Sequence, residues 1–267
     1  MREELAQSAM IARDLLEAQK TRRTFTPIRS NREPIGLPLA YAAQRHVVQA
    51  YIDRGDGVPI GYKVGLTNPA MWAMAGVNQP IAGVVLGGRA LSSPAVLSNA
   101  QFVRLGIESE MAVRIARRLP TGPARKDKAA IAQCIDRIYA AFEIVEDRDA
   151  DYAQLDAASI VAENSWNAGI VLGEGIPISG AEALEGLTGA LYVDGEHVQS
   201  GSSNDVLGHP CNVVGWLADH LDQAGEALAP GQIVMTGAIV PTKFPRPGQT
   251  FRFEIDGLPP VELQIDP

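Results

Sequence analysis

A period of two on both sides of an Asp-Gly pair, in the C-terminal stretch TFRFEIDGLPPVELQI, restricts the fold more than any other pattern in this chain. Apolar side chains alternate with polar ones around Asp256-Gly257: Phe251, Phe253 and Ile255 before it, and Val261, Leu263 and Ile265 after it. Alternation puts the apolar set on one face of a strand, and Asp-Gly favours tight hairpin turns. The stretch therefore predicts an antiparallel hairpin with one buried face, which argues against a doubly wound parallel sheet.

A second Asp-Gly pair, Asp194-Gly195 in LYVDGEHV, predicts another hairpin. The stretch GHPCNVVGWLADHLDQAG between the two hairpins predicts a helix, because Pro210 suits its first turn and Gly225 lies just past its end. Its apolar side chains recur at helical spacing and should cover one sheet: Val213, Val214, Leu217 and Leu221. His209, directly before this helix, is interpreted as a capping or turn residue, with a catalytic role as the alternative.

The first third of the chain predicts helices rather than strands. Apolar residues at three-to-four spacing indicate an amphipathic helix: Leu5, Ala9, Ala12 and Leu16. A proline-punctuated connector over residues 24–38 precedes a second predicted helix over 39–52. GYKVGL, residues 61–66, predicts a buried strand, and a helical turn should follow it.

From about Pro80 the chain predicts short strands separated by Gly and Pro. Asp127 could cap one further helix with its apolar side chains on a single face: Ile131, Ile135, Ile138 and Phe142. Helices first and strands afterwards indicate an α+β fold. We expect a small N-terminal helical part over residues 1–75 and a body of mixed sheets over residues 76–267.

Composition restricts the class of function. The 267 residues carry a net charge of −8, so a nucleic-acid partner is not expected, and an anionic substrate would need basic side chains or a metal nearby. Cys134 and Cys211 have no metal or redox spacing, and no apolar run is long enough to span a bilayer. The first ten residues lack the apolar core of a signal peptide, so a cytoplasmic protein without a membrane partner is expected.

RLGIESEMAVRIARRLP, residues 104–120, puts Glu108 and Glu110 on one face of a predicted strand. Two readings stay open at this point: the pair decorates a solvated face, or a cation lies between the two carboxylates. Glu143, in the apolar run AAFEIVEDR, is a third candidate, because a buried glutamate must be paired, protonated or bound to metal. Oxygen-only ligation would suit Mg²⁺ or Mn²⁺.

Lys63, on the predicted strand GYKVGL, has two readings of its own. It is either an edge-strand lysine with its ammonium in solvent, or a partly desolvated acid/base with a lowered pKa. The chain contains no phosphate-binding loop, dinucleotide fingerprint or nucleophile elbow.

Seven stretches in this order resemble the 2-oxo-4-pentenoate hydratase and 4-oxalocrotonate decarboxylase group of the fumarylacetoacetate hydrolase superfamily: GYKVGLTNPAM, GVNQPIAGVVL, GIESEMAVRIARRLP, AFEIVEDRDADY, NAGIVLG, VLGHPCNVVGWLADHL and PGQIVMTGAIVPTKFPRPGQTF. The similarity runs from about Gly61 to the C-terminus. It implies a fumarylacetoacetate hydrolase-like body of mixed β-sheets, arranged as a β-roll or sandwich, and a site for Mg²⁺ or Mn²⁺. The residues that correspond to the metal ligands are Glu108, Glu110 and Glu143, and Lys63 corresponds to the active-site lysine. The resemblance further suggests that five residues contact the substrate: Gly65, Leu66, Ser165, Trp166 and Lys243.

The activity that the resemblance implies is metal-dependent hydration of a 2-hydroxy-2,4-dienoate or 2-oxo-enoate to a 4-hydroxy-2-oxo acid, in a homo-oligomer. Ile81 stands where many hydratases of this group have an aspartate that partners the lysine, whereas the decarboxylases tend to be apolar at this position. Trp166, Val240 and Lys243 also depart from the hydratase pattern and suggest a reshaped pocket.

Three alternatives therefore stay open: decarboxylation of a 4-oxalocrotonate-like 2-oxo-enedioate, an inactive metal-containing binding protein, and hydrolysis of a carbon–carbon bond. Hydrolysis is the least favoured, because no stretch clearly supplies a His–carboxylate pair to activate water.

Overall fold

The computed structural model describes residues 2–30 and 33–267, so positions 31–32 of the predicted connector lie outside the described residues. Six α-helices occur in this part of the chain: α1 (Arg2–Lys20), α2 (Leu37–Asp53), α3 (Pro69–Ala75), α4 (Lys128–Ala132), α5 (Ala157–Ala162) and α6 (Pro210–Gln223). The strands are β1 (Arg29–Ser30), β2 (Glu33–Pro34), β3 (Pro59–Gly65), β4 (Ile81–Leu86), β5 (Ala90–Ser92), β6 (Ala95–Ser98), β7 (Leu105–Ile115), β8 (Ile135–Glu146), β9 (Asn167–Leu172), β10 (Ile176–Pro177), β11 (Thr188–Val193), β12 (Glu196–Ser202), β13 (Ile233–Lys243), β14 (Thr250–Ile255) and β15 (Val261–Asp266).

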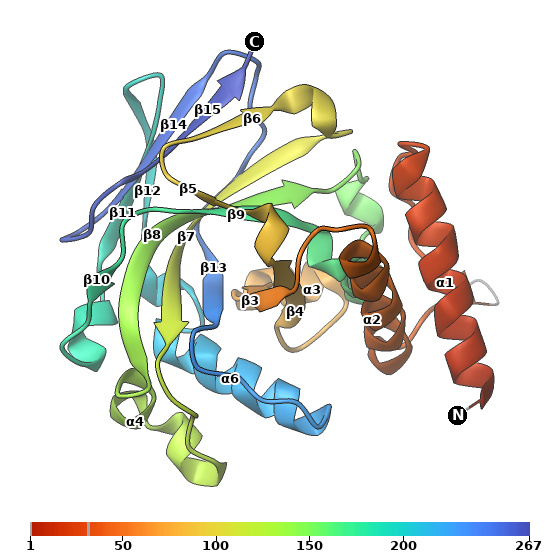
Figure 1. Ribbon diagram of the computed structural model, residues 1–267, viewed down its shortest axis with the longest axis horizontal. Helices are drawn as coiled ribbons and strands as arrows, with labels where there is room; N and C mark the ends of the chain where they lie inside the picture. The colour runs from red at the N-terminus through yellow and green to blue at the C-terminus, as the bar shows by residue number, and fades with distance from the viewer. Residues whose placement is uncertain (1, 31–32) are drawn as a thin grey trace.

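Two mixed sheets form the body of the molecule (Figure 1). The larger has the order β4-β3-β13-β7-β8-β9-β5, with β10 paired to β8, and the smaller has the order β12-β11-β14-β15-β6. Most neighbouring strands are antiparallel, while β3 with β13, β5 with β9, and β6 with β15 are parallel. The predicted α+β class with mixed sheets is therefore confirmed.

Both predicted hairpins are present in the smaller sheet. β11 and β12 pair across Asp194-Gly195, and β14 and β15 pair antiparallel on either side of the turn that begins at Asp256. The side chains that alternate in the sequence are all buried: Phe251, Phe253, Ile255, Val261, Leu263 and Ile265. Their periodicity alone thus predicted which face of this hairpin enters the core.

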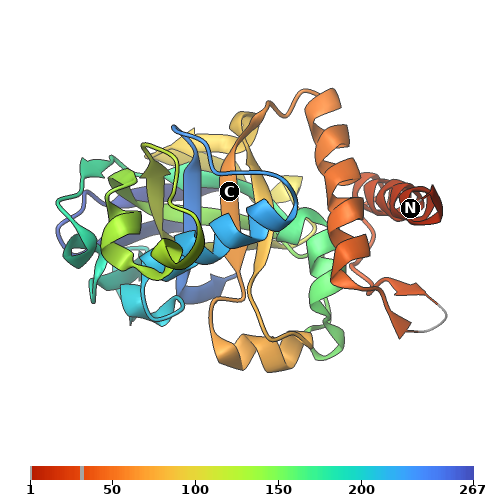
Figure 2. The ribbon, with the colours of Figure 1, turned by 90° about the horizontal axis from the view of Figure 1, so that it is seen from below.

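The N-terminal helices α1 and α2 lie side by side, at the far side of the larger sheet from the β14–β15 hairpin (Figures 1 and 2). The predicted face of α1 is partly wrong. Leu5 is 61% exposed and Ala9 is exposed, while the buried stripe is Ser8, Ile11, Ala12 and Leu15. The buried face is thus rotated from the predicted one, because only side chains that meet α2 and its neighbours leave solvent.

β3 lies before residue 76, yet it is hydrogen-bonded between β4 and β13 within the larger sheet. The division of the chain at residues 75 and 76 stays a prediction. No helix within residues 2–30 and 33–267 is long and apolar enough to cross a membrane.

The helix predicted from Asp127 to Phe142 is wrong beyond its first turn. Asp127 does cap a helix, since its Oδ1 accepts from the backbone N–H of Ala129 at 2.9 Å, but α4 ends at Ala132. Residues 135–146 form β8, a central strand whose residues 138–145 are buried on both faces. Such a strand has no two-residue alternation, so its isoleucines fit a helical spacing by coincidence.

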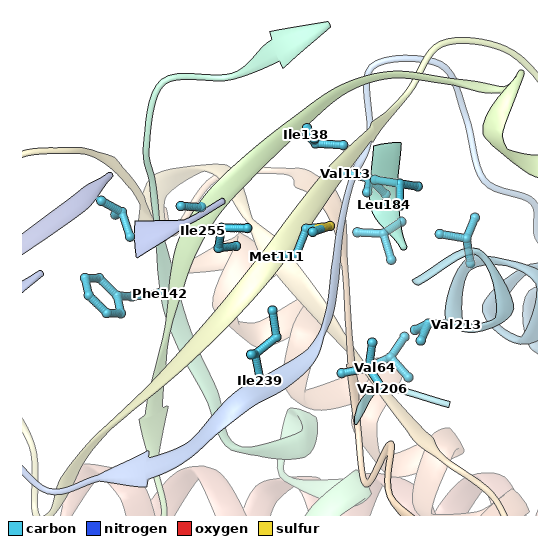
Figure 3. Close-up of a cluster of buried hydrophobic side chains, with 14 of the residues drawn as sticks. Val64, Met111, Val113, Ile138, Phe142, Leu184, Val206, Val213, Ile239 and Ile255 are labelled. Atoms are coloured by element: carbon cyan, nitrogen blue, oxygen red, sulfur yellow. The ribbon is translucent and has the colours of Figure 1, made fainter. Parts of the chain in front are cut away.

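The α6 helix begins and ends where the sequence predicted, and its four predicted core residues are buried. Figure 3 shows Val213 of α6 in the same buried cluster as Val64 of β3, Val206, Met111 of β7 and Ile239 of β13. His209 caps the helix, because its Nδ1 accepts from the backbone N–H of Cys211 at 3.0 Å. The capping interpretation of His209 is confirmed.

Phe253 should be essential to the packing of the smaller sheet. Its side chain is fully buried and its ring lies 6.3 Å from that of Phe142 on β8. Phe253→Ala should lower the free energy of unfolding by about 3–5 kcal/mol, because it leaves a cavity between the sheets. Arg252→Ala, on the exposed face of the same strand, should cost less than about 1 kcal/mol. Urea unfolding measures both, and equal effects would contradict this packing.

Candidate active site

Three glutamates converge on the central pair of strands. Glu108 and Glu110 alternate on β7 with the buried residues Ile107, Ser109 and Met111, and Glu143 of β8 is the antiparallel partner of Glu108. One carboxylate oxygen from each side chain can be chosen so that all three lie within 4.8 Å of one another. The register of β7 against β8 thus brings together residues that are more than thirty positions apart.

Each glutamate is held in place by a neighbouring group. Thr242 Oγ1 donates to Glu108 Oε1 at 2.6 Å, and Asn167 Nδ2 donates to Glu143 Oε1 at 2.9 Å. The backbone N–H of Gly237 donates to Glu110 Oε2 at 2.9 Å. Gly237 has a φ of +105°, a conformation that favours glycine, and this bend in β13 presents its N–H to the carboxylate. These three contacts were not predicted, because each depends on strand pairing rather than on local sequence.

Two carboxylate oxygens in this group lack a donor. Glu110 Oε1 and Glu143 Oε2 are buried and have no hydrogen-bond partner within residues 2–30 and 33–267. Burial raises the pKa of Glu110 well above its usual range, and the charges of Glu143 and Glu108 raise it further. Burial also raises the pKa of Glu143, although Lys63 opposes the shift. Unpaired oxygens on crowded, buried carboxylates are what a divalent cation with oxygen ligands requires, so the residues present fit such an ion.

Lys63 lies beside the glutamates and not in solvent. It occupies β3, between β4 and β13, with its Nζ 3.3 Å from Glu143 Oε1 and its side chain 6% exposed. The solvent-exposed reading of Lys63 is therefore wrong. Burial lowers the pKa of the ammonium, but the charges of Glu143, Glu108 and Glu110 outweigh it and raise the pKa above its ordinary value. The predicted lowering is thus reversed, because all three carboxylates surround the lysine.

A cavity of about 520 Å³ opens beside this group. Lys63 and Glu108 line it, together with four of the five residues predicted to contact the substrate: Gly65, Leu66, Ser165 and Trp166. Lys243 is not among the lining residues, but its Nζ donates to Oε1 of the lining residue Gln199 at 2.7 Å. Val240 packs in the core instead, which corrects its predicted part in the pocket. Ile81 lines the cavity near Lys63.

A strained loop forms one wall of the cavity. Asn164, Ser165 and Trp166 have φ values of +52°, +51° and +60°, which is unfavourable for residues other than glycine. Both atoms of the Asn164 amide bond the backbone of Val84 on β4, at 2.8 and 2.9 Å. Ser165 Oγ donates to the carbonyl of Ala82 at 2.8 Å, so the loop is clamped to β4. Backbone strain held in this way is characteristic of functional sites.

The chain is similar to several known proteins. The family model described as fumarylacetoacetate (FAA) hydrolase C-terminal matches residues 63–266. A 2-keto-4-pentenoate hydratase from Burkholderia vietnamiensis is 31% identical over 253 residues, which cover 94% of each chain. A 4-oxalocrotonate decarboxylase from Pseudomonas putida is 28% identical over 85% of this chain and 84% of its own length.

Among solved structures, a 4-oxalocrotonate decarboxylase from Pseudomonas putida G7, complexed with magnesium and adipate, superimposes with a TM-score of 0.87. It is 26% identical, and the alignment covers 99% of this chain and 98% of that one. The similarity extends over both sheets and the N-terminal helices. The chain therefore belongs to the fumarylacetoacetate hydrolase family.

Proposed function

We propose that the protein is a divalent-metal-dependent lyase that hydrates a 2-hydroxy-2,4-dienoate or 2-oxo-enoate to a 4-hydroxy-2-oxo acid. The observation that carries this proposal is the convergence of Glu108, Glu110 and Glu143 beside Lys63 at the wall of a cavity. The relatives named 2-keto-4-pentenoate hydratase support the reaction, and the neighbour complexed with magnesium supports the metal.

Glu108, Glu110 and Glu143 would hold Mg²⁺ or Mn²⁺, since the donors are all oxygens. When bound, the cation supplies Lewis-acid stabilisation of the negative charge that develops on a 2-oxo group during the reaction. When all three carboxyl groups are ionised, they and the one ammonium leave two negative charges uncompensated, which matches a divalent ion.

Lys63 is the group that would hold and move the proton. Its Nζ lies in the cavity wall beside Glu143, so it can reach a substrate and has an acceptor 3.3 Å away. Ser165 and Trp166 on the clamped loop, with Leu66 and Ile81 in the same cavity lining, would orient the substrate chain.

Decarboxylation of a 2-oxo-enedioate is the second candidate, and Ile81 favours it. This apolar side chain is 1% exposed and lies near Lys63, at a position where the resemblance implies an aspartate in many hydratases of this group. Both reactions need the same stabilisation of developing charge, so the fold and the glutamates do not separate them.

Product mass separates the two reactions. The purified protein should be incubated with Mg²⁺ and a panel of 2-oxo-enoates and 2-oxo-enedioates, and the products weighed by mass spectrometry. We expect the gain of one water. The loss of CO₂ would replace hydration with the second candidate, and bound metal without turnover of any panel member would indicate a binding protein.

Glu110→Gln should weaken Mg²⁺ and Mn²⁺ binding by more than about a hundredfold, because it removes one of the three buried or partly buried charged ligands. Calorimetry measures the affinity directly. Glu196→Gln removes the same charge from an exposed site on β12 and should leave the affinity unchanged. Similar affinities in both variants would end the assignment of the metal site.

Lys63→Met should cut the rate by about two to four orders of magnitude, the usual range for a general acid/base. Metal affinity should hold or rise, because the variant keeps the three carboxylates and loses a competing cation. Steady-state kinetics and calorimetry on the same preparation test both parts. Full turnover by Lys63→Met would refute the proposed role.

We also propose a homo-oligomer, on the strength of the family resemblance. Light scattering at micromolar concentration should give a multiple of the 28.5 kDa chain mass. A mass of one chain would contradict this.

A further inference from the structure

The cavity beside the glutamates is poor in positive charge. Lys63, Glu108 and Asp205 are the ionisable acidic and basic side chains among its described lining residues, apart from the phenol of Tyr152. Lys63 is already engaged by Glu143, and Asp205 is exposed and accepts from the backbone N–H of Ser202 at 2.8 Å. The lining itself therefore offers nothing to neutralise an anionic group at a distance from Lys63 and the glutamates.

Lys243 supplies a cation just behind this lining. Its Nζ donates to Gln199 Oε1 at 2.7 Å, and Gln199 lines the cavity together with Ser200 and Gly201 of β12. In the part of the chain that the structure describes, no carboxylate lies within ion-pairing distance of this ammonium, although acidic residues outnumber basic ones by 31 to 23. A half-buried cation held by a neutral amide lacks a counter-ion.

Gln199 connects the Lys243 ammonium with the cavity lining. Its Oε1 is occupied by the Lys243 ammonium, and its Nε2 has no hydrogen-bond partner among the described residues. An amide whose oxygen binds a cation is a polarised donor, so Nε2 can donate to an anion in the cavity. Lys243 follows Thr242 on β13, and Thr242 donates a hydrogen bond to Glu108. Lys243 is therefore on a strand that borders the proposed metal site.

We propose that Gln199 and Lys243 recognise a second anionic group, so that the substrate is a 2-oxo dicarboxylate. This inference rests on the proposed function, in which the first carboxylate and the 2-oxo group lie beside the glutamates. Gln199 donates to the distal carboxylate and Lys243 compensates its charge. In a chain of net charge −8, such a local cation is needed to admit a dianion.

Two ligands of equal size test the inference by calorimetry on the Mg²⁺-loaded protein. They are 2-oxoadipate and its isostere 2-oxo-6-methylheptanoate, in which an isopropyl group replaces the distal carboxylate. The wild type should bind 2-oxoadipate more tightly. Lys243→Met should weaken 2-oxoadipate binding about tenfold or more and leave the isostere unchanged. Gln199→Met should act in the same direction, whereas Lys243→Arg should keep most of the affinity.

Arg246→Gln is the matched control, because it removes one positive charge from an exposed loop three residues further along the chain. It should change the binding of neither ligand. Equal losses for both ligands in Lys243→Met, no loss for either, or tighter wild-type binding of the isostere would overturn the dicarboxylate inference alone. Failure of both ligands to bind the Mg²⁺-loaded wild type would instead count against the proposed function, and against this inference with it.

Discussion

The mutual repulsion of three carboxylates in a largely buried site is the constraint on which the rest of the structure depends. Glu110 and Glu143 are 1% and 0% exposed, and one ammonium, that of Lys63, cannot balance them and Glu108. Such an arrangement persists only where the surrounding fold holds it. The long β7–β8 pairing fixes the glutamates, and β3 and β13 carry the lysine and the Gly237 N–H to them.

Local periodicity predicted part of this arrangement and could not predict the rest. Alternation put Glu108 and Glu110 on one face, as β7 has them, and the two Asp-Gly pairs gave both hairpins. The position of Glu143 opposite Glu108 depends on the register between strands far apart in sequence, so family resemblance and not spacing indicated it. The same resemblance assigned the active-site role to Lys63. No local sequence pattern marks Asn167, Thr242 and Gly237, because their role depends on hydrogen bonds to glutamates on other strands.

The strained loop shows how stability elsewhere supports the site. Three successive left-handed residues cost roughly 1–3 kcal/mol each. Asn164 offsets part of this by bonding both backbone groups of Val84, as a neighbouring strand would. Just before the loop, Glu163 forms a buried bidentate ion pair with Arg148, at 2.7 and 2.9 Å. These contacts place Ser165 and Trp166 in the cavity wall, where the family resemblance, and no local periodicity, had suggested them.

Ile81 provides no carboxylate to exchange a proton with the Lys63 ammonium. A Cβ built on Gly65 would lie 3.1 Å from Lys63 Nζ and 3.6 Å from Ile81 Cγ1, so the lysine and the isoleucine meet there. A carboxylate in place of Ile81 would add a fourth negative charge to a site where three carboxylates already outnumber the single ammonium of Lys63. With isoleucine present, Glu143 is the carboxylate in ion-pair contact with Lys63, and the proposed cation would share that glutamate. Metal binding and proton transfer would therefore be coupled through Glu143, because a carboxylate drawn toward the cation holds the ammonium proton less strongly.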